Sequence, residues 1–141
     1  CVFHLHNEAG IAVSAQAKGL LPLSQHAMRF YKDLAYHPYQ GLALSTSEQS
    51  ELIANLGNKK AVLLRNHGSL VCGSTIAQAF YLMHTLDKAC NIQLKISNLD
   101  QVHFPSDSIC TQTYEQLCAD GDAEGQIEWP AFQRYLINSF H

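Results

Sequence analysis

Short apolar blocks alternate with polar positions along this chain, and the period of the alternation changes from block to block. Residues 1–6 are β-prone and alternate with a period of two, which predicts a strand. Residues 61–64 form an apolar run that predicts a buried strand, and residues 70–72 predict another after a turn at residues 66–68. Residues 7–17 are compatible with either a strand or a core helix.

Other segments repeat their apolar residues at helical spacing and carry helix start signals. Ser45 and Glu48 form one capping box, and Thr75 and Gln78 form a second. The segment at residues 36–41 contains a proline and is expected to be a loop or a short extended piece, because the residue before proline avoids the helical conformation. The predicted helices cover residues 24–34, 45–56, 75–95, 107–119 and 128–140.

The alternation of strands and helices predicts an α/β layered domain. The 141 residues are enough for one domain, and an apolar fraction of 47% with a charged fraction of 15% argues against disorder. The chain opens at Cys1 with no initiator Met, and the next residues are already strand-like. We therefore expect sequence upstream of Cys1 to have been removed or left out.

The composition narrows the possible partners. The net charge is -3 and there is no basic run, so we expect no nucleic-acid surface. No apolar stretch approaches the roughly 18 residues that span a bilayer, so we expect no membrane span. Five cysteines, an odd number without a CxxC pair, predict neither a disulfide scaffold nor a cysteine-rich zinc site. Reduced thiols and a cytoplasmic location are the corresponding expectations.

His4 and His6 are the first candidates for chemistry. On a strand, residues i and i+2 point to the same face, so the two imidazoles would converge from a stiff platform. His67 is a third candidate, because it follows an apolar strand and stands beside Gly68, which permits a tight turn or a close approach. Three imidazoles suit Zn²⁺ and leave a fourth position open, which would polarise a carbonyl or enediolate oxygen.

Spacing alone leaves a second interpretation equally open, in which the three histidines are separate and bond to backbone carbonyls. The chain also contains several separate motifs whose order and spacing match those of a known protein family. They are CVFHLH at 1–6, AVSA at 12–15, GLLPLS at 19–24, LAYH at 34–37, YQG at 39–41, NLG at 55–57, LLRNHG at 63–68, and AFY at 79–81 leading to AC at 89–90. With these motifs the chain resembles the class II aldolase/adducin family, and most of all the adducin head domain and its bacterial relatives.

The resemblance implies a three-layer domain with a central, mainly antiparallel sheet flanked by helices, of which the N-terminal part is missing here. The whole chain, 1–141, would be the C-terminal portion of that domain, with the resemblance strongest over 1–95 and a helical tail at about 99–141. The family's metal ligands carry over to His4, His6 and His67, with Zn²⁺ or another divalent metal as cofactor. A homo-oligomer, by resemblance a tetramer, is also implied.

The resemblance leaves the acid/base group open. In the family's aldolases an acidic residue and phosphate-binding loops lie upstream of the HxH motif, and a tyrosine comes from a neighbouring subunit. With one insertion allowed, His26 falls near the place of that tyrosine. We take His26 and Tyr36 as the candidate catalytic residues, Tyr36 as part of a polar-aromatic cluster with His37 and Tyr39.

Four further polar residues have two interpretations each, an ordinary structural role and a functional one. Glu8 is a surface carboxylate or a ligand to metal or substrate, and His84 is a locally bonded helix residue or a functional one. Arg65 and Asn66 either orient His67 or form ordinary hydrogen bonds at the end of a strand.

Two functions from different classes follow. The first is a metal-dependent lyase that acts on a small hydroxyketone or sugar (phosphate) through an enediolate stabilised by the three-histidine site, with a related epimerase or dehydratase as a variant. The second is a non-catalytic interaction module of the adducin type, because family membership does not establish catalysis.

Overall fold

A four-stranded sheet lies at the centre of the computed structural model, which describes residues 1–41 and 46–139. Its strands are β1 (Val2–Leu5), β2 (Leu34–His37), β3 (Ala61–Leu64) and β4 (Gly68–Cys72). They lie in the order β1-β4-β3-β2. β4 pairs antiparallel with both β1 and β3, whereas β2 pairs parallel with β3, so the sheet is mainly antiparallel.

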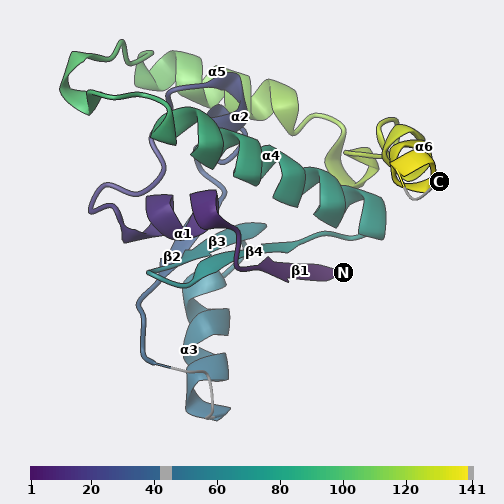
Figure 1. Ribbon diagram of the computed structural model, residues 1–141, viewed down its shortest axis with the longest axis horizontal. Helices are drawn as coiled ribbons and strands as arrows, with labels where there is room; N and C mark the ends of the chain where they lie inside the picture. Colours follow the sequence, from purple (N-terminus) through teal and green to yellow (C-terminus); the bar gives the residue numbers. More distant parts are fainter. Residues whose placement is uncertain (42–45, 140–141) are drawn as a thin grey trace.

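Helices cover both faces of this sheet (Figure 1). On one face lie α1 (Glu8–Ala15) and the long α4 (Ile76–Leu94), and on the other lies α3 (Thr46–Leu56). The larger apolar core forms between the sheet and the helices α1 and α4, and it includes Val13, Leu63, Val71, Leu82 and Leu86. A smaller core joins β2 and β3 to α3 through Ala35, Val62 and Leu64, with Leu52, Leu56 and Leu70 packed against them. The predicted α/β layered fold is confirmed.

The remaining helices form an outer layer beside α4 (Figure 1). They are α2 (Gln25–Met28), η1 (Leu99–Gln101), α5 (Asp107–Leu117), η2 (Gly121–Ala123) and α6 (Trp129–Ser139). Within the described part of the chain, no helix is long and apolar enough to cross a bilayer. All five cysteines lie in described positions and each is a free thiol there.

One predicted helix is too long, since the helix expected over residues 24–34 ends after one turn, as α2. The loop or short extended piece expected over 36–41 begins with two extended residues, which are the last two of strand β2. Parallel pairing with β3, from Leu34 opposite Ala61 to His37 opposite Leu64, draws this segment into the sheet. The extended conformation that precedes Pro38 is compatible with this strand. The capping box expected at Ser45 begins outside the described residues.

A buried ion cluster fastens the C-terminal segment to the layer beneath it. The guanidinium of Arg29, only 2% exposed, donates to both carboxylate oxygens of Glu124 through Nε and Nη2. Its Nη1 donates to Asp33 at 3.0 Å. Burial acts to lower the pKa of Arg29, but its hydrogen bonds and the charge of Glu124 outweigh burial, so the net shift is upward. The cluster is therefore charged, bidentate and hydrogen-bonded.

Breaking this cluster from one side should be costly. Glu124→Ala leaves the Arg29 cation buried with one carboxylate, and we expect the free energy of unfolding to fall by about 3 kcal/mol. The double variant Arg29→Met/Glu124→Leu removes the cation together with Glu124, leaves Asp33 with the bond from the Lys60 N–H, and should recover part of that loss. Urea unfolding followed by circular dichroism measures both. A Glu124→Ala variant as stable as the wild type would contradict this account. A double variant less stable than the Glu124→Ala variant would also contradict it.

Candidate metal centre

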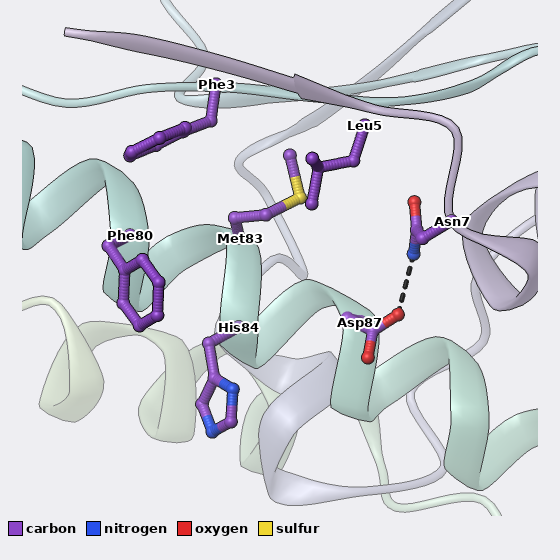
Figure 2. Close-up of a pocket in the computed structure, with 7 residues that line it drawn as sticks. All are labelled: Phe3, Leu5, Asn7, Phe80, Met83, His84 and Asp87. Carbon is purple, nitrogen blue, oxygen red and sulfur yellow. Dashed lines mark hydrogen bonds between the residues drawn. The ribbon is translucent and has the colours of Figure 1, made fainter. Parts of the chain in front are cut away.

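Strand β1 divides its side chains between two environments. Phe3 and Leu5 face α4, where they line a groove of about 370 Å³ with Phe80 and Met83 (Figure 2). Because side chains alternate along a strand, His4 and His6 lie on the opposite face, and both are exposed. The HxH spacing predicts two imidazoles on one face, and the rings of His4, in β1, and His6, directly after it, lie side by side there.

The third imidazole comes from the turn between β3 and β4. Asn66 adopts a left-handed conformation with φ 58°, which asparagine tolerates better than most residues. Its backbone N–H donates to Ser14 Oγ at 3.0 Å, and the N–H of His67 donates to the Leu64 carbonyl at 3.0 Å. These bonds close the turn and turn His67 toward β1.

Gly68 lets the two halves of the site approach each other. A Cβ at this position would lie 2.3 Å from the carbonyl oxygen of Leu5, which is far inside van der Waals contact. Any larger residue would push β1 away from β4 or move the turn. Since His4 lies in β1, His6 directly follows it and the turn carries His67, the absence of a side chain at Gly68 allows all three rings to meet.

The three rings form one compact group. The Nε2 atoms of His4 and His6 are 3.0 Å apart, and those of His6 and His67 are 2.8 Å apart. Ring centroids are separated by 4.7 to 5.0 Å. His67 is half-buried and the other two are exposed, so one side of the group opens to solvent.

A backbone contact fixes the proton on His4. Its Nδ1 lies 3.0 Å from the carbonyl oxygen of Ser69, and a carbonyl can only accept. Nδ1 therefore carries the hydrogen, and Nε2 presents a lone pair to the group. Histidines that ligate metals are commonly held in this way, with the second ring nitrogen donating to a carbonyl or carboxylate.

The donor set fits a divalent metal ion. Three neutral imidazole nitrogens, with one open side, are the ligands of a common type of catalytic zinc site. Among the described residues, the only atoms that could ligate one ion together are those of His4, His6 and His67. Glu8, in the first turn of α1, is exposed and does not join them.

Tyr36 lies on the other side of the sheet, with the residues that pack against the larger core. Its hydroxyl oxygen accepts from the Leu20 N–H at 2.9 Å, and burial raises the pKa of the phenol. The space is tight, since a Cβ on Gly19 would fall 2.2 Å from that oxygen. Within one chain, Tyr36 and the three-histidine group therefore face opposite sides of the sheet.

Arg65 and Asn66 bond at the end of the strand. Nη1 of Arg65 donates to the carbonyls of Ser14 at 2.9 Å and Gln16 at 2.7 Å, and its guanidinium lies 4.3 Å from the centre of the Tyr36 ring. The pair thus holds the end of α1 against the sheet. Asn66 acts on His67 only through the shape of the turn.

The remaining candidates are scattered. His26, on α2, borders a small cavity with Tyr81 and Thr85 of α4, away from β1. His84 stacks on Phe80, and burial lowers its pKa.

The cluster expected at Tyr36, His37 and Tyr39 is split by the strand. His37 turns to α3, where it contacts Asn55, while the ring of Tyr39 lies edge-on to His67 at 6.4 Å. The sequence grouped Tyr39 with Tyr36 and His37, but Tyr39 lies beyond the end of β2, and the strand separates the three side chains.

The chain matches the family model of the Class II Aldolase and Adducin N-terminal domain over residues 1–94. It is 39% identical to a Pseudomonas aeruginosa protein whose own assignment as a class 2 aldolase is provisional, over 96% of this chain and 54% of that protein. It is 44% identical to mouse alpha-adducin, over 67% of this chain and 13% of adducin.

Solved structures agree with these matches. A crystal structure of an aldolase II superfamily protein from Pseudomonas syringae superposes with a TM-score of 0.92 at 42% identity, covering 98% of this chain and 56% of that one. L-fuculose 1-phosphate aldolase from Glaciozyma antarctica gives a TM-score of 0.70 at 29% identity, over 82% of this chain and 43% of that one.

This chain therefore belongs to the class II aldolase and adducin family. It spans about half the length of the bacterial relatives that it matches, 54% and 53%. The family model ends at residue 94, and the division into a family region at 1–95 and a helical tail at 99–141 stays a prediction.

Gly68→Ala tests whether close strand approach brings the rings together. The added methyl group should displace β1, lower the free energy of unfolding by about 2 kcal/mol, and weaken zinc binding. Gly41→Ala is the control for destabilisation without a clash, because its φ of 96° strains an alanine while no atom lies within 4 Å of the added Cβ. Urea unfolding and chelator competition measure the two effects. Equal zinc affinity in the Gly68 variant and the control would contradict the role given to Gly68.

Proposed function

We propose that this protein is a metal-dependent lyase of the class II aldolase type, acting on a small hydroxyketone or sugar (phosphate). The observation that carries the proposal is the group formed by His4, His6 and His67, whose neighbouring Nε2 atoms are 2.8 and 3.0 Å apart. The likeness to L-fuculose 1-phosphate aldolase, at 29% identity, supports a substrate of this class.

The chain's own residues have a limited set of tasks in such a site. His4, His6 and His67 hold the ion, which we take to be Zn²⁺, and the bond from His4 to the Ser69 carbonyl keeps one ligand in the correct tautomer. A bound divalent ion supplies Lewis acidity, which stabilises negative charge on the substrate oxygens as a C–C bond breaks. Tyr39, 54% exposed beside His67, forms part of the rim through which a substrate enters.

Proton transfer requires a group that this cluster lacks. Imidazoles whose lone pairs hold a metal cannot also serve as the general acid, and a donor must lie within about 3 Å of the reacting atom or one water away. We propose that the intact protein is a cytoplasmic homo-oligomer, a tetramer, in which a neighbouring subunit supplies this group. His26 is the candidate, since it is half-buried on an outer helix and remote from the metal group of its own chain. Tyr36 reaches a neighbour's site only if its bond to Leu20 is released.

A second function has an observation of its own. The 44% identity to mouse alpha-adducin is higher than that to the bacterial relative, although it covers a shorter part of this chain. A non-catalytic interaction module would keep the sheet and its helices without needing the three histidines to bind metal.

Metal content separates the two functions first. We expect the purified wild-type chain to bind about one Zn²⁺, and we expect His4→Ala and His67→Ala to weaken binding by more than about 100-fold, because each removes a ligand. His103→Ala is the control, since His103 is exposed and lies outside the group. Chelator competition and elemental analysis give the affinities. Wild-type affinity in both ligand variants would remove the basis of the proposal.

Catalysis is tested directly with L-fuculose 1-phosphate. We expect the zinc-loaded, oligomeric protein to release an aldehyde and a triose phosphate, chelation to abolish the reaction, and added Zn²⁺ to restore it. Activity should fall on dilution to monomers, and His26→Ala should lower kcat while leaving zinc content unchanged. A zinc-loaded oligomer that cleaves no hydroxyketone or sugar phosphate would instead favour the interaction module.

A further inference from the structure

Three polar side chains form a continuous hydrogen-bonded path from α4 to β4, on the side of the sheet away from the histidine rings. Asn7 Nδ2 donates to Asp87 Oδ1 at 2.7 Å, the bond drawn in Figure 2. Ser69 Oγ donates to Asn7 Oδ1 at 2.6 Å. We refer to Asp87, Asn7 and Ser69 as the relay. It links a helix, the junction after β1 and a central strand.

The direction of each bond in the relay is fixed. The carboxylate of Asp87 only accepts, so the NH₂ of Asn7 must face it and the amide oxygen must face Ser69. Asn91 Nδ2 donates to the other oxygen of Asp87 at 3.0 Å, which holds that carboxylate from a second side. The relay is therefore a polar path with a defined donor and acceptor at every step.

Asn7 gives up its usual local role in order to form the relay. It is the N-cap residue of α1, where an asparagine side chain ordinarily accepts from a backbone N–H of the first turn. Here the side chain makes no capping bond and is turned toward Ser69 and Asp87 instead.

Gly10 is a second, independent observation, because the side-chain amide of Asn7 occupies the space that a side chain at Gly10 would need. Glycine is a poor residue inside a helix, and Gly10 stands within α1. A Cβ at Gly10 would lie 2.6 Å from Oδ1 and 2.9 Å from Nδ2 of Asn7. An alanine there would favour the helix but would drive the Asn7 side chain out of the relay.

Ser69 connects the relay to the metal group. It is completely buried, with its hydroxyl engaged by Asn7 and its carbonyl oxygen accepting from His4 Nδ1 at 3.0 Å. The carbonyl that sets the tautomer and ring orientation of His4 thus belongs to the residue that the relay anchors. Asn7 also follows His6 directly, so the same amide fixes the end of the strand that carries both ligands.

We propose that Asp87, Asn7 and Ser69 are positioning residues for the metal site and hold His4 in its ligating tautomer and orientation. The proposal rests on the proposed function in that it takes His4 as a metal ligand. None of the three touches metal or substrate, and each acts through the Ser69 carbonyl and the end of β1.

The test uses two variants that break the relay in different ways. Ser69→Ala removes the hydroxyl and keeps the carbonyl, and Gly10→Ala displaces Asn7 while favouring the helix. Asn91→Ala is the matched control, because it removes a hydrogen bond to the same carboxylate outside the path to His4. The measurements, on the full chain, are Zn²⁺ affinity by chelator competition and the visible spectrum of bound Co²⁺.

We expect both relay variants to bind Zn²⁺ about 10- to 100-fold more weakly, with a changed Co²⁺ spectrum, which is typical when the support of a ligand is lost. The control should stay within about threefold of the wild type. Relay variants with wild-type affinity and spectrum would overturn the proposal. An equal loss in Asn91→Ala would also overturn it, because the effect would then be general destabilisation.

Nitrogen-15 NMR of the histidine rings in the metal-free protein separates this proposal from the proposed function. We expect the Nδ1–H tautomer of His4 in the wild type and a tautomer mixture in both relay variants. If the wild type binds no metal but shows this difference, the lyase proposal fails, and the relay keeps only its role of holding the His4 ring in one tautomer. If the wild type binds metal and His4 is unchanged in the variants, the relay proposal fails alone.

Discussion

The distance between β1 and β4 governs the rest of this structure, and one contact controls it. At Gly68 the absence of a Cβ lets the Leu5 carbonyl lie where a side chain would otherwise stand. That approach permits the antiparallel register of the two strands, with Leu5 opposite Ser69. The register in turn places the Ser69 carbonyl beside His4 and the turn residue His67 beside His6. Ring geometry, tautomer and the anchoring of β1 all follow from it.

Local patterns predicted the elements that depend on local physics. The period of two at residues 1–6, the apolar run at 61–64 and the Thr75 cap each correspond to an observed element, and the cap bonds as expected, with the Gln78 N–H donating to Thr75 Oγ1 at 3.1 Å. Part of β2 was predicted only as a loop or short extended piece, because its identity as a strand comes from pairing with β3, a partner 27 positions later in the register. Nothing in four residues around a proline encodes such a partner.

The metal site also combines features that local sequence predicts with features that depend on the pairing of distant strands. The common face of His4 and His6 follows from spacing alone, but the contribution of His67 depends on a strand register that the sequence does not display. The relay had no local signal either. Asn7 resembles an ordinary helix cap, and Gly10 resembles an unfavourable helix residue, until the fold shows that the second makes room for the first.

The division of the three imidazoles between two segments has a thermodynamic consequence. His4 lies in β1 and His6 directly follows it, whereas His67 comes from the turn between β3 and β4. Each opening of β1 would separate His4 and His6 from His67 at once, so an ion bound to all three must be released first or must hold the strand closed. Ion binding and strand opening are therefore linked equilibria, and slower amide hydrogen exchange along β1 would report the occupancy of the site.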